Sequence, residues 1–357
     1  MTVYIGAEHI ISPLGNSAEE NFTNACEGKS GIRLVKNGNF KQDSDLYLAK
    51  FDEGVNLDAI VNECFNSLHI DKSVLTSNKT KIIFSSTKGY LSDGIEHALV
   101  DVINKFTLSE QLSNTPILIS SACISGVVAI AKAGELIKAN FYDNVIVIGI
   151  DFLSDFVVYG FEALYALSKE VCKPFDKDRI GINLGEACSA VVLSKNEPIF
   201  NEPPLEFVSG SSSNDANHIS GPSRAGEGLY RSIQKTLSSG NISKSDIGYI
   251  SAHGTATKYN DTMEAIAFNR HGLENVKLNS LKGYFGHTLG AAGVVEVSMA
   301  MQQLRHQKVL QSLGYANSGD DENLNIITTT EPHQFNAFLK TASGFGGGNA
   351  SIVIKKT

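Results

Sequence analysis

Short runs of apolar, mostly β-branched residues recur along the whole chain, and they constrain its fold more than any other feature. Such runs are typical of strands that are buried on both faces of a sheet. Between them lie stretches rich in small residues, over about 124–139 and about 288–305, which predict helices. Alternating buried strands and helices predict an α/β fold built in layers. The predicted strands are Lys81–Phe84, Ile117–Ile119, Val145–Ile148, Ala190–Leu193, Ile247–Ile250 and Ser351–Ile354.

The length and one polar segment predict two halves. The 357 residues are enough for two domains or for one duplicated unit. Segment 201–204 is polar and contains two prolines, as a linker would. We therefore expect a first half over residues 1–200 and a second half over 201–357. Cys123 and His287 each open a small-residue helix with a glycine three residues later. This similarity between the two segments favours a duplicated unit, although any tight turn from strand to helix selects glycine and alanine.

Charge and cysteine content exclude several broad classes of protein. The net charge of −8 argues against binding of nucleic acid or anionic membranes over a broad surface, although a local basic patch could still receive an acidic partner. No apolar run approaches the roughly 18–20 residues of a membrane span, and the N-terminus shows no signal peptide. The five cysteines are scattered without a Cys-x-x-Cys pair, so neither a disulfide framework nor a zinc ribbon is expected. A reduced, cytoplasmic setting is the simplest interpretation.

Cys123 lies where the predicted strand 117–119 turns sharply into the first small-residue helix. A cysteine at a helix N-terminus faces unpaired N–H groups and the positive end of the helix dipole. Both favour the thiolate, which is the reactive form of cysteine. Taken alone, however, this window fits a small, buried structural cysteine better. The same interpretation holds for the other cysteines, which are Cys26, Cys64, Cys172 and Cys188.

Two histidines stand at similar positions in the second half. His253 follows a predicted strand, and His287 begins the second small-residue helix. Because 34 residues separate them, they can meet only through tertiary folding. One histidine in a glycine-rich turn is usually structural, but two of them together with Cys123 favour chemistry. No His-x-x-x-His or His/Asp cluster accompanies them, so no metal site is expected. Lys282 and Glu296 flank His287 and would by themselves fit an ordinary surface lysine and a helix glutamate.

Five segments, in order, resemble the β-ketoacyl-acyl-carrier-protein synthase family, the condensing enzymes of fatty-acid and polyketide assembly. Each segment is moderately specific, but all five in the family's order are highly specific and extend over nearly the whole chain. The resemblance implies the thiolase fold, in which two pseudo-symmetric α/β halves form five αβαβα layers and the protein is usually dimeric. The segments are Ser121–Gly126, Lys173–Glu186, Ala252–Thr257, Lys282–Glu296 and Gly344–Asn349.

The resemblance also implies catalytic roles. Cys123 would take an acyl group from a carrier-protein thioester. His253 and His287 would bind the malonyl thioester as it loses carbon dioxide, giving a 3-oxoacyl carrier protein. Lys282 and Glu296 would form a pair that supports the histidines.

Further residues would bind the substrate. The resemblance implies that the backbone N–H groups of Cys123 and Phe345 form an oxyanion hole. Thr255 and Thr257 would line the tunnel for the carrier's phosphopantetheine, and Ile182 would lie near the acyl tunnel. No metal or redox cofactor is implied, because the substrates arrive on phosphopantetheine.

Two related enzymes and one non-catalytic subunit are the alternatives to this function. A degradative thiolase would carry a second cysteine near the C-terminal glycine loop, and residues 346–348 contain none. A starter-type synthase would show Asn where His287 stands. A non-catalytic subunit like a chain-length factor typically lacks the nucleophile, so Cys123, His253 and Lys282 argue against it. It stays as the alternative function.

The expected partners are an acyl carrier protein, acyl and malonyl thioesters, and a second subunit. That subunit is either an identical chain or one like a chain-length factor. Arg224, Lys258 and Lys282 are the candidate cations for an acidic carrier protein.

Several positions depart from the family's pattern. Ile182 in Gly181-Ile-Asn183 stands where the family has an aromatic residue, so the sequence leaves the preferred acyl length open. Gly348 stands where the family commonly has Thr. The run 81–123 leaves little room for the lobe that usually contributes to the dimer interface. Compact members occur in specialised polyene and polyketide clusters, so either fatty-acid or specialised synthesis is expected.

Overall fold

The computed structural model describes residues 1–36, 45–52, 54–92, 95–215, 223–318 and 323–357. Ten strands form one sheet, ordered β13-β12-β16-β17-β11-β1-β10-β8-β4-β7. It consists of two sets of five that repeat the same directions: two antiparallel pairings followed by two parallel ones. The first set is β1 (Tyr4–Ile11), β10 (Ala187–Ser194), β8 (Asn144–Asp151), β4 (Thr80–Ser85) and β7 (Ile117–Ile119). The second is β11 (Leu205–Asn214), β17 (Gly348–Lys356), β16 (Ala337–Gly344), β12 (Tyr249–Ser251) and β13 (Lys277–Asn279).

The two sets are joined where β1 pairs with β11, at Tyr4 with Glu206 and Ile5 with Leu205. The chain passes from the first set to the second between β10 and β11, and the predicted boundary at residue 200 falls in this interval. The repeated strand order is the pseudo-symmetry that the thiolase fold implies.

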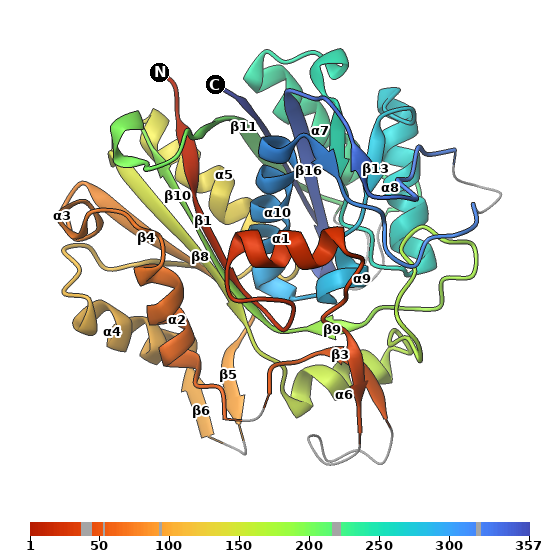
Figure 1. The fold of residues 1–357 in the computed structure, drawn as a ribbon, viewed down its shortest axis with the longest axis horizontal. Helices are drawn as coiled ribbons and strands as arrows, with labels where there is room; N and C mark the ends of the chain where they lie inside the picture. The colour runs from red at the N-terminus through yellow and green to blue at the C-terminus, as the bar shows by residue number, and fades with distance from the viewer. Residues whose placement is uncertain (37–44, 53, 93–94, 216–222, 319–322) are drawn as a thin grey trace.

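Helices complete five layers (Figure 1). Helices α5 (Ser125–Lys138) and α10 (Ala292–His306) lie between the two sets and contact strands of both. Helices α2 (Leu57–Asn66) and α4 (Leu99–Ser109) belong to the layer outside the first set. Helices α7 (Glu227–Gly240) and α8 (Lys258–His271) cover the second set. The predicted αβαβα thiolase fold is therefore confirmed.

The apolar runs form strands that are buried on both faces of the sheet, as the sequence predicts. Every residue of β8 and β10 is buried, because helices cover both faces of the sheet. The two central helices also match the predicted small-residue stretches. In α10 every residue from Ala292 to Leu304 is buried, and residues 289–291 form a separate 3₁₀ turn before it, so the α-helix begins later than expected.

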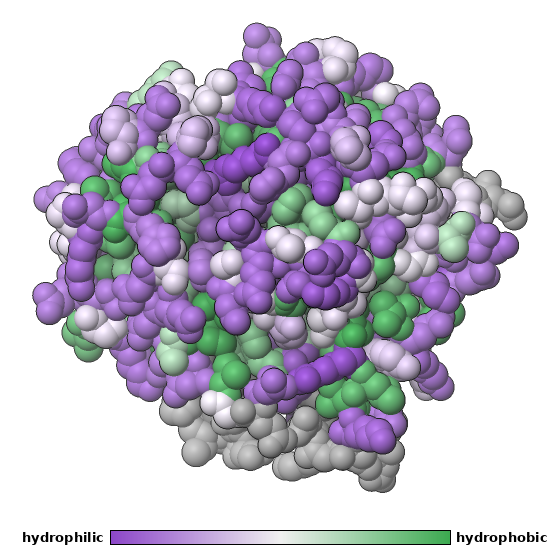
Figure 2. All heavy atoms as spheres, viewed as in Figure 1, coloured by the Kyte–Doolittle hydropathy of each residue, from purple (hydrophilic) through white to green (hydrophobic). Residues whose placement is uncertain are grey.

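Shorter elements connect these layers. Within the run 81–123, β4 and β7 are separated by a hairpin and α4. No helix of the described residues is long and apolar enough to cross a membrane. Figure 2 shows hydrophilic side chains over most of one face, with smaller hydrophobic groups between them. The other helices are α1 (Ala18–Cys26), α3 (Lys72–Leu75), α6 (Asp155–Ala163) and α9 (Lys282–Phe285), with 3₁₀ turns η1 (Glu197–Ile199), η2 (Lys244–Asp246), η3 (Leu289–Ala291) and η4 (Phe345–Gly347). The other strands are β2 (Arg33–Val35), β3 (Leu46–Ala49), β5 (Gly89–Ser92), β6 (Ile95–Ala98), β9 (Leu184–Gly185), β14 (Lys308–Val309) and β15 (Glu331–Pro332).

Glycine allows α5 and α10 to touch through their backbones. A Cβ added at Gly126 would lie 2.7 Å from the amide nitrogen of Val294 and 2.9 Å from Cα of Gly293. Both atoms belong to the backbone of α10, so neither can move aside cheaply. The two helices can therefore pack this closely only while position 126 lacks a side chain.

We predict that Gly126→Ala destabilises the protein by about 1–3 kcal/mol, the usual cost of overpacking a core. Gly160→Ala is the matched control, because a Cβ there meets no atom within 4 Å and alanine favours the helix by up to ~1 kcal/mol. Denaturant unfolding of the variants measures both effects. An unchanged midpoint for Gly126→Ala would show that the contact does not constrain the core.

Candidate active site

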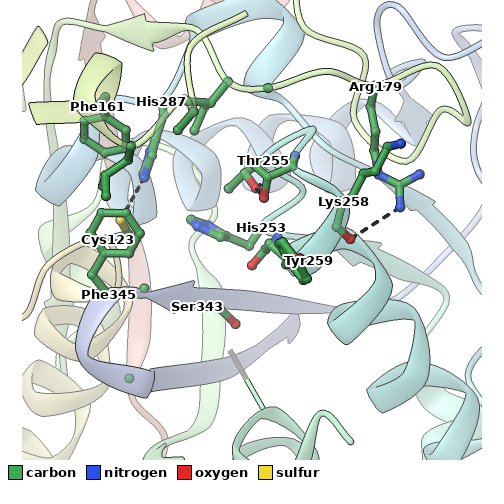
Figure 3. Close-up of a pocket in the computed structure, with 18 of the residues that line it drawn as sticks. Cys123, Phe161, Arg179, His253, Thr255, Lys258, Tyr259, His287, Ser343 and Phe345 are labelled. Carbon is green, nitrogen blue, oxygen red and sulfur yellow. Dashed lines mark hydrogen bonds between the residues drawn. The ribbon is translucent and has the colours of Figure 1, made fainter. Parts of the chain in front are cut away.

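Three side chains from distant parts of the chain meet at the ends of the central layers. Cys123 lies between β7 and α5, His253 follows β12, and His287 lies between α9 and η3. All three are buried, with at most 8% of the residue exposed. Nε2 of His287 is 2.9 Å from Sγ of Cys123, and the two histidine rings lie 5.2 Å apart, centre to centre, at 82° (Figure 3). The structure thus brings together the three residues that the sequence proposed for catalysis.

The turn at Cys123 is as sharp as the sequence predicted. Ala122 has a left-handed backbone with φ 48°, a conformation that costs roughly 1–2 kcal/mol for a residue with a Cβ. Ser125 holds this turn, because its Oγ accepts from the amide of Ser121 and donates to the carbonyl of Ala122. The strained turn aims the sulfur into the site.

Burial sets the protonation state of the site. It raises the pKa of the Cys123 thiol to about 11, although Lys282 and the backbone N–H groups of Phe345 and Cys123 act in the opposite direction. The thiolate that the helix N-terminus was expected to favour is therefore not the resting form. Burial, followed by the charge of Lys282, holds the pKa of His253 and His287 well below the usual value. Both imidazoles are neutral at pH 7, and His287 can accept the thiol proton.

The C-terminal glycine loop closes over the nucleophile. The backbone N–H groups of Phe345 and Cys123 both lower the pKa of the Cys123 thiol, so they lie near the sulfur, where donors to a carbonyl oxygen of a bound thioester would be needed. Phe345 is 42% exposed, and its ring stacks on Phe161 of α6 with 5.6 Å between the centres. Asn349 holds the loop from behind, because its Nδ2 donates to Asp215 and to the carbonyl of Gly347.

Lys282 and Glu296 form a buried ion pair behind the histidines. Lys282 is completely buried, so the expectation that it could be a surface cation for a carrier protein is wrong. Its side chain is enclosed because α9 packs against α1 and β1 of the first half as well as against α10.

Sequence reasoning missed three buried charged residues next to the site. Lys340 of β16 lies 2.7 Å from the second carboxylate oxygen of Glu296. Glu264 of α8 accepts hydrogen bonds from the amides of His253 and Gly254. Asp261 accepts from the amide of Thr255, and burial raises its pKa to about 7. The i, i+3 spacing of these acids, just after the His253 motif, was a signal that could have identified them. Lys340 lies in an apolar strand and gave no comparable signal.

A cavity of about 640 Å³ leads from the sulfur to the surface. Cys123 and both histidines line it, as do the predicted substrate residues Thr255, Thr257, Phe345 and Ile182. The hydroxyls of Thr255 and Thr257 lie 2.9 Å apart, and Ile182 is buried in the wall. Lys258 also lines this cavity, whereas Arg224 lines a neighbouring hollow.

The catalytic trio is also a geometric candidate for metal ligation. Within the part of the chain that the structure describes, only Cys123, His253 and His287 form a group of three possible ligands, with their ligating atoms all within 4.8 Å of one another. The positive charge of Lys282 acts on both histidines and on the thiol, and such a charge opposes a cation at this place.

Comparison with known families identifies the class of protein. The beta-ketoacyl synthase N-terminal domain matches residues 111–198, and the beta-ketoacyl synthase C-terminal domain matches residues 206–316. Together these matches extend over more than half of the chain. The chain therefore belongs to the beta-ketoacyl synthase family, which confirms the expected family and its class of acyl-transferring condensing enzymes.

Individual relatives agree with this assignment. The 3-oxoacyl-(acyl-carrier-protein) synthase 2 of Rhizobium meliloti is 32% identical over 251 residues, which are 66% of this chain and 59% of the relative. The synthase 2 of Staphylococcus aureus (strain COL) is 24% identical over 398 residues, 97% of this chain and 96% of the relative. Among solved structures, a chain of the ketosynthase ApeO in complex with its chain length factor ApeC, from Xenorhabdus doucetiae, is 25% identical with a TM-score of 0.86. The match covers 100% of this chain and 98% of that chain.

We predict that alkylation of Cys123 by iodoacetamide speeds up about tenfold per pH unit from pH 7 to 9.5, because the thiolate fraction grows in that proportion below the thiol pKa of about 11. Peptide mass spectrometry after timed quenching gives the rate at this residue alone. A rate that levels off near pH 7 would show that a Cys123–His287 ion pair already exists in the free protein.

Proposed function

We propose that the protein is an acyltransferase that performs a decarboxylative Claisen condensation. It would join an acyl group held on Cys123 to the two-carbon unit of a malonyl carrier protein and release a 3-oxoacyl carrier protein. The convergence of the Cys123 sulfur, two neutral histidines and two backbone N–H donors at the end of one cavity carries this proposal. The names of the relatives, which act on acyl carrier proteins, support the same chemistry.

The first half-reaction loads the acyl group. His287 Nε2 takes the proton of Cys123, and the sulfur attacks the carbonyl carbon of an acyl thioester. The carbonyl oxygen becomes negative and accepts hydrogen bonds from the N–H groups of Cys123 and Phe345. When the bond to the carrier's sulfur breaks, His287 gives the proton to the carrier's sulfur, the carrier leaves as a thiol, and the acyl group remains on Cys123.

The second half-reaction forms the carbon–carbon bond. The malonyl thioester loses its carboxylate as carbon dioxide, and the electron pair of the broken bond forms an enolate. N–H groups of neutral His253 and of neutral His287, the latter in the tautomer protonated on Nε2, stabilise the enolate oxygen, because they are fixed donors in a buried site. The enolate carbon attacks the acyl carbonyl, the bond to Cys123 breaks, and the thiolate takes up from solvent the one proton that the overall reaction consumes.

The same geometry weighs against a non-catalytic subunit. A chain-length-factor-like partner would not need a strained turn that aims a nucleophile at a histidine, and here both are present. The solved complex of ApeO with ApeC shows that a ketosynthase and a chain length factor can pair. We propose that this chain is the catalytic subunit of a dimer, whose second subunit is either an identical chain or such a factor.

Carrier protein and location complete the proposal. The acyl and malonyl groups would arrive on phosphopantetheine past Thr255 and Thr257, with Lys258 at the same cavity as a cation for an acidic carrier. Ile182, buried in the wall, would help to set the acyl length. The cytoplasm is proposed as the location because none of the described cysteines is in a disulfide.

Incubation with an acyl carrier-protein thioester should add one acyl group to the intact protein and none to Cys123→Ala. The reason is that only Cys123 combines the cavity, the histidine and the oxyanion donors. Intact-mass spectrometry measures the adduct, and Cys26→Ala is the matched control that should load normally. An adduct that persists in Cys123→Ala would overturn the proposal.

Cys123→Gln should decarboxylate a malonyl carrier protein without condensing it, and His287→Ala in that background should slow the release of carbon dioxide at least about a hundredfold through loss of an enolate donor.

We also propose that the site needs no metal or other cofactor, so the rate of decarboxylation by Cys123→Gln should be unchanged after dialysis against EDTA. Released carbon dioxide is measured with labelled malonate. A loss of decarboxylation in EDTA that zinc restores would contradict the proposal that no metal is needed. An unchanged rate in His287→Ala would contradict the role of His287 as an enolate donor.

A further inference from the structure

Lys340 is a second lysine ammonium in the interior next to the active site. It lies in β16, is completely buried, and follows three apolar residues in its own strand. Its Nζ donates to the carbonyls of Ser251 at 3.2 Å and Ala252 at 3.0 Å, and it lies 2.7 Å from a carboxylate oxygen of Glu296. The ammonium group therefore has two hydrogen-bond acceptors and one ion-pair partner.

Neutralising Glu296 does not by itself explain why Lys340 is there. The other oxygen of Glu296 is already paired with the Lys282 ammonium. A buried charge is costly unless its surroundings satisfy it, and an apolar side chain is the common choice in a strand of this kind. What distinguishes Lys340 from Lys282 is its pair of backbone carbonyl partners at the end of β12.

These two carbonyls belong to the two residues that directly precede His253 in the chain. On the other side of the same segment, Glu264 accepts from the amides of His253 and Gly254 at 2.9 and 2.6 Å. The carbonyls of residues 251 and 252 are therefore held by the Lys340 cation, and the amides of residues 253 and 254 by the Glu264 anion, while the hydroxyl of Ser280 donates to the carbonyls of residues 253 and 254. The two charged groups come from neighbouring elements, β16 and α8.

The ring of His253 depends on this backbone for its orientation. Its Nδ1 is buried and has no hydrogen-bond partner among the residues that the structure describes. A histidine that donates a proton to substrate normally has its other ring nitrogen held by a carboxylate or a carbonyl. Since His253 lacks such a contact, the direction of its Nε2 is set by the position of its Cα and by the packing around the ring.

We propose that Lys340 is a positioning residue that fixes the end of β12, and with it His253, for the decarboxylation half-reaction. The proposal rests on the proposed function, because it assigns a task within that reaction. Lys340 does not line the cavity and does not contact Cys123. Its charge also helps to lower the pKa of His287, so its loss should affect the loading of Cys123 slightly and the step that needs His253 most.

Lys340→Met removes the ammonium but keeps a long, unbranched side chain, and Glu296 keeps Lys282 as its partner. In the Cys123→Gln background we expect malonyl decarboxylation to fall about tenfold, as is common when a contacting pair is uncoupled. With Cys123 intact, the rate of acyl loading should stay within about twofold. Lys340→Gln, which keeps one donor group for a carbonyl, should lie between the parent and Lys340→Met in decarboxylation.

A double-mutant cycle tests whether Lys340 acts through His253. In a Cys123→Gln, His253→Ala background, Lys340→Met should cause no further loss of decarboxylation, because the histidine that it positions is absent. Lys138→Met is the control, since Lys138 is an exposed lysine that also donates to a backbone carbonyl, that of Val208, away from the site. It should leave both rates unchanged.

The outcomes separate the alternatives. Equal losses of loading and decarboxylation in Lys340→Met and Lys340→Gln would show a general structural role and overturn the proposal. So would unchanged decarboxylation, or losses that multiply with His253→Ala. If Cys123→Gln itself releases no carbon dioxide while Cys123 still loads, the proposed condensation fails, and the role of Lys340 fails with it.

Discussion

The close contact of α5 with α10 is the constraint on which the site depends. Each helix begins with a residue that carries chemistry, Cys123 before α5 and His287 before α10, and the helices cross where Gly126 meets Gly293. Backbone contact at that crossing brings the two helix starts together, so the sulfur and Nε2 reach 2.9 Å. The duplication of the fold thus has a direct chemical result. Equivalent turns in the two halves carry the nucleophile, Cys123, and its base, His287. Neither half contains the pair alone.

Burial then determines how this pair works. A thiol and two imidazoles that were exposed would titrate near their ordinary values, but here the loss of water favours the neutral form of all three. A neutral histidine can take a proton from Cys123 in one half-reaction and offer an N–H group to an enolate in the other. In the second step Cys123 carries the acyl group, so His287 no longer faces a thiol. The N–H groups of Cys123 and Phe345 stabilise the negative carbonyl oxygen that forms when the sulfur attacks.

The local part of this architecture could be predicted from the sequence, and the long-range part could not. Runs such as 145–148 and 190–193 predict buried strands because a doubly covered strand excludes polar residues, and the small-residue stretches predict the two central helices for a similar reason. The motifs identified Cys123, His253 and His287 through their order along the chain. By contrast, the burial of Lys282 and the place of Lys340 depend on how α9 and β16 pack in three dimensions. The sequence predicts a lowered pKa for Cys123, whereas the structure raises it, and the reason is the same. The helix N-terminus can be recognised in the sequence, but the larger effect of burial cannot.

Both histidines are held mainly by their backbones, and a buried charge from each half takes part. Nδ1 of His287, like that of His253, has no hydrogen-bond partner among the described residues. Asp151, at the end of β8 in the first half, accepts from the amide of Gly290 at 2.7 Å and so holds the turn that follows His287. Lys340, in the second half, holds the peptide that precedes His253. An anion can fix a backbone by accepting from its amides, and a cation can fix it by donating to its carbonyls. Both kinds of charge-assisted hydrogen bond are strong in a buried, low-dielectric interior. It is Nε2 of His287 that meets the sulfur, and the charges that fix the two backbones stay one step removed from the reacting atoms.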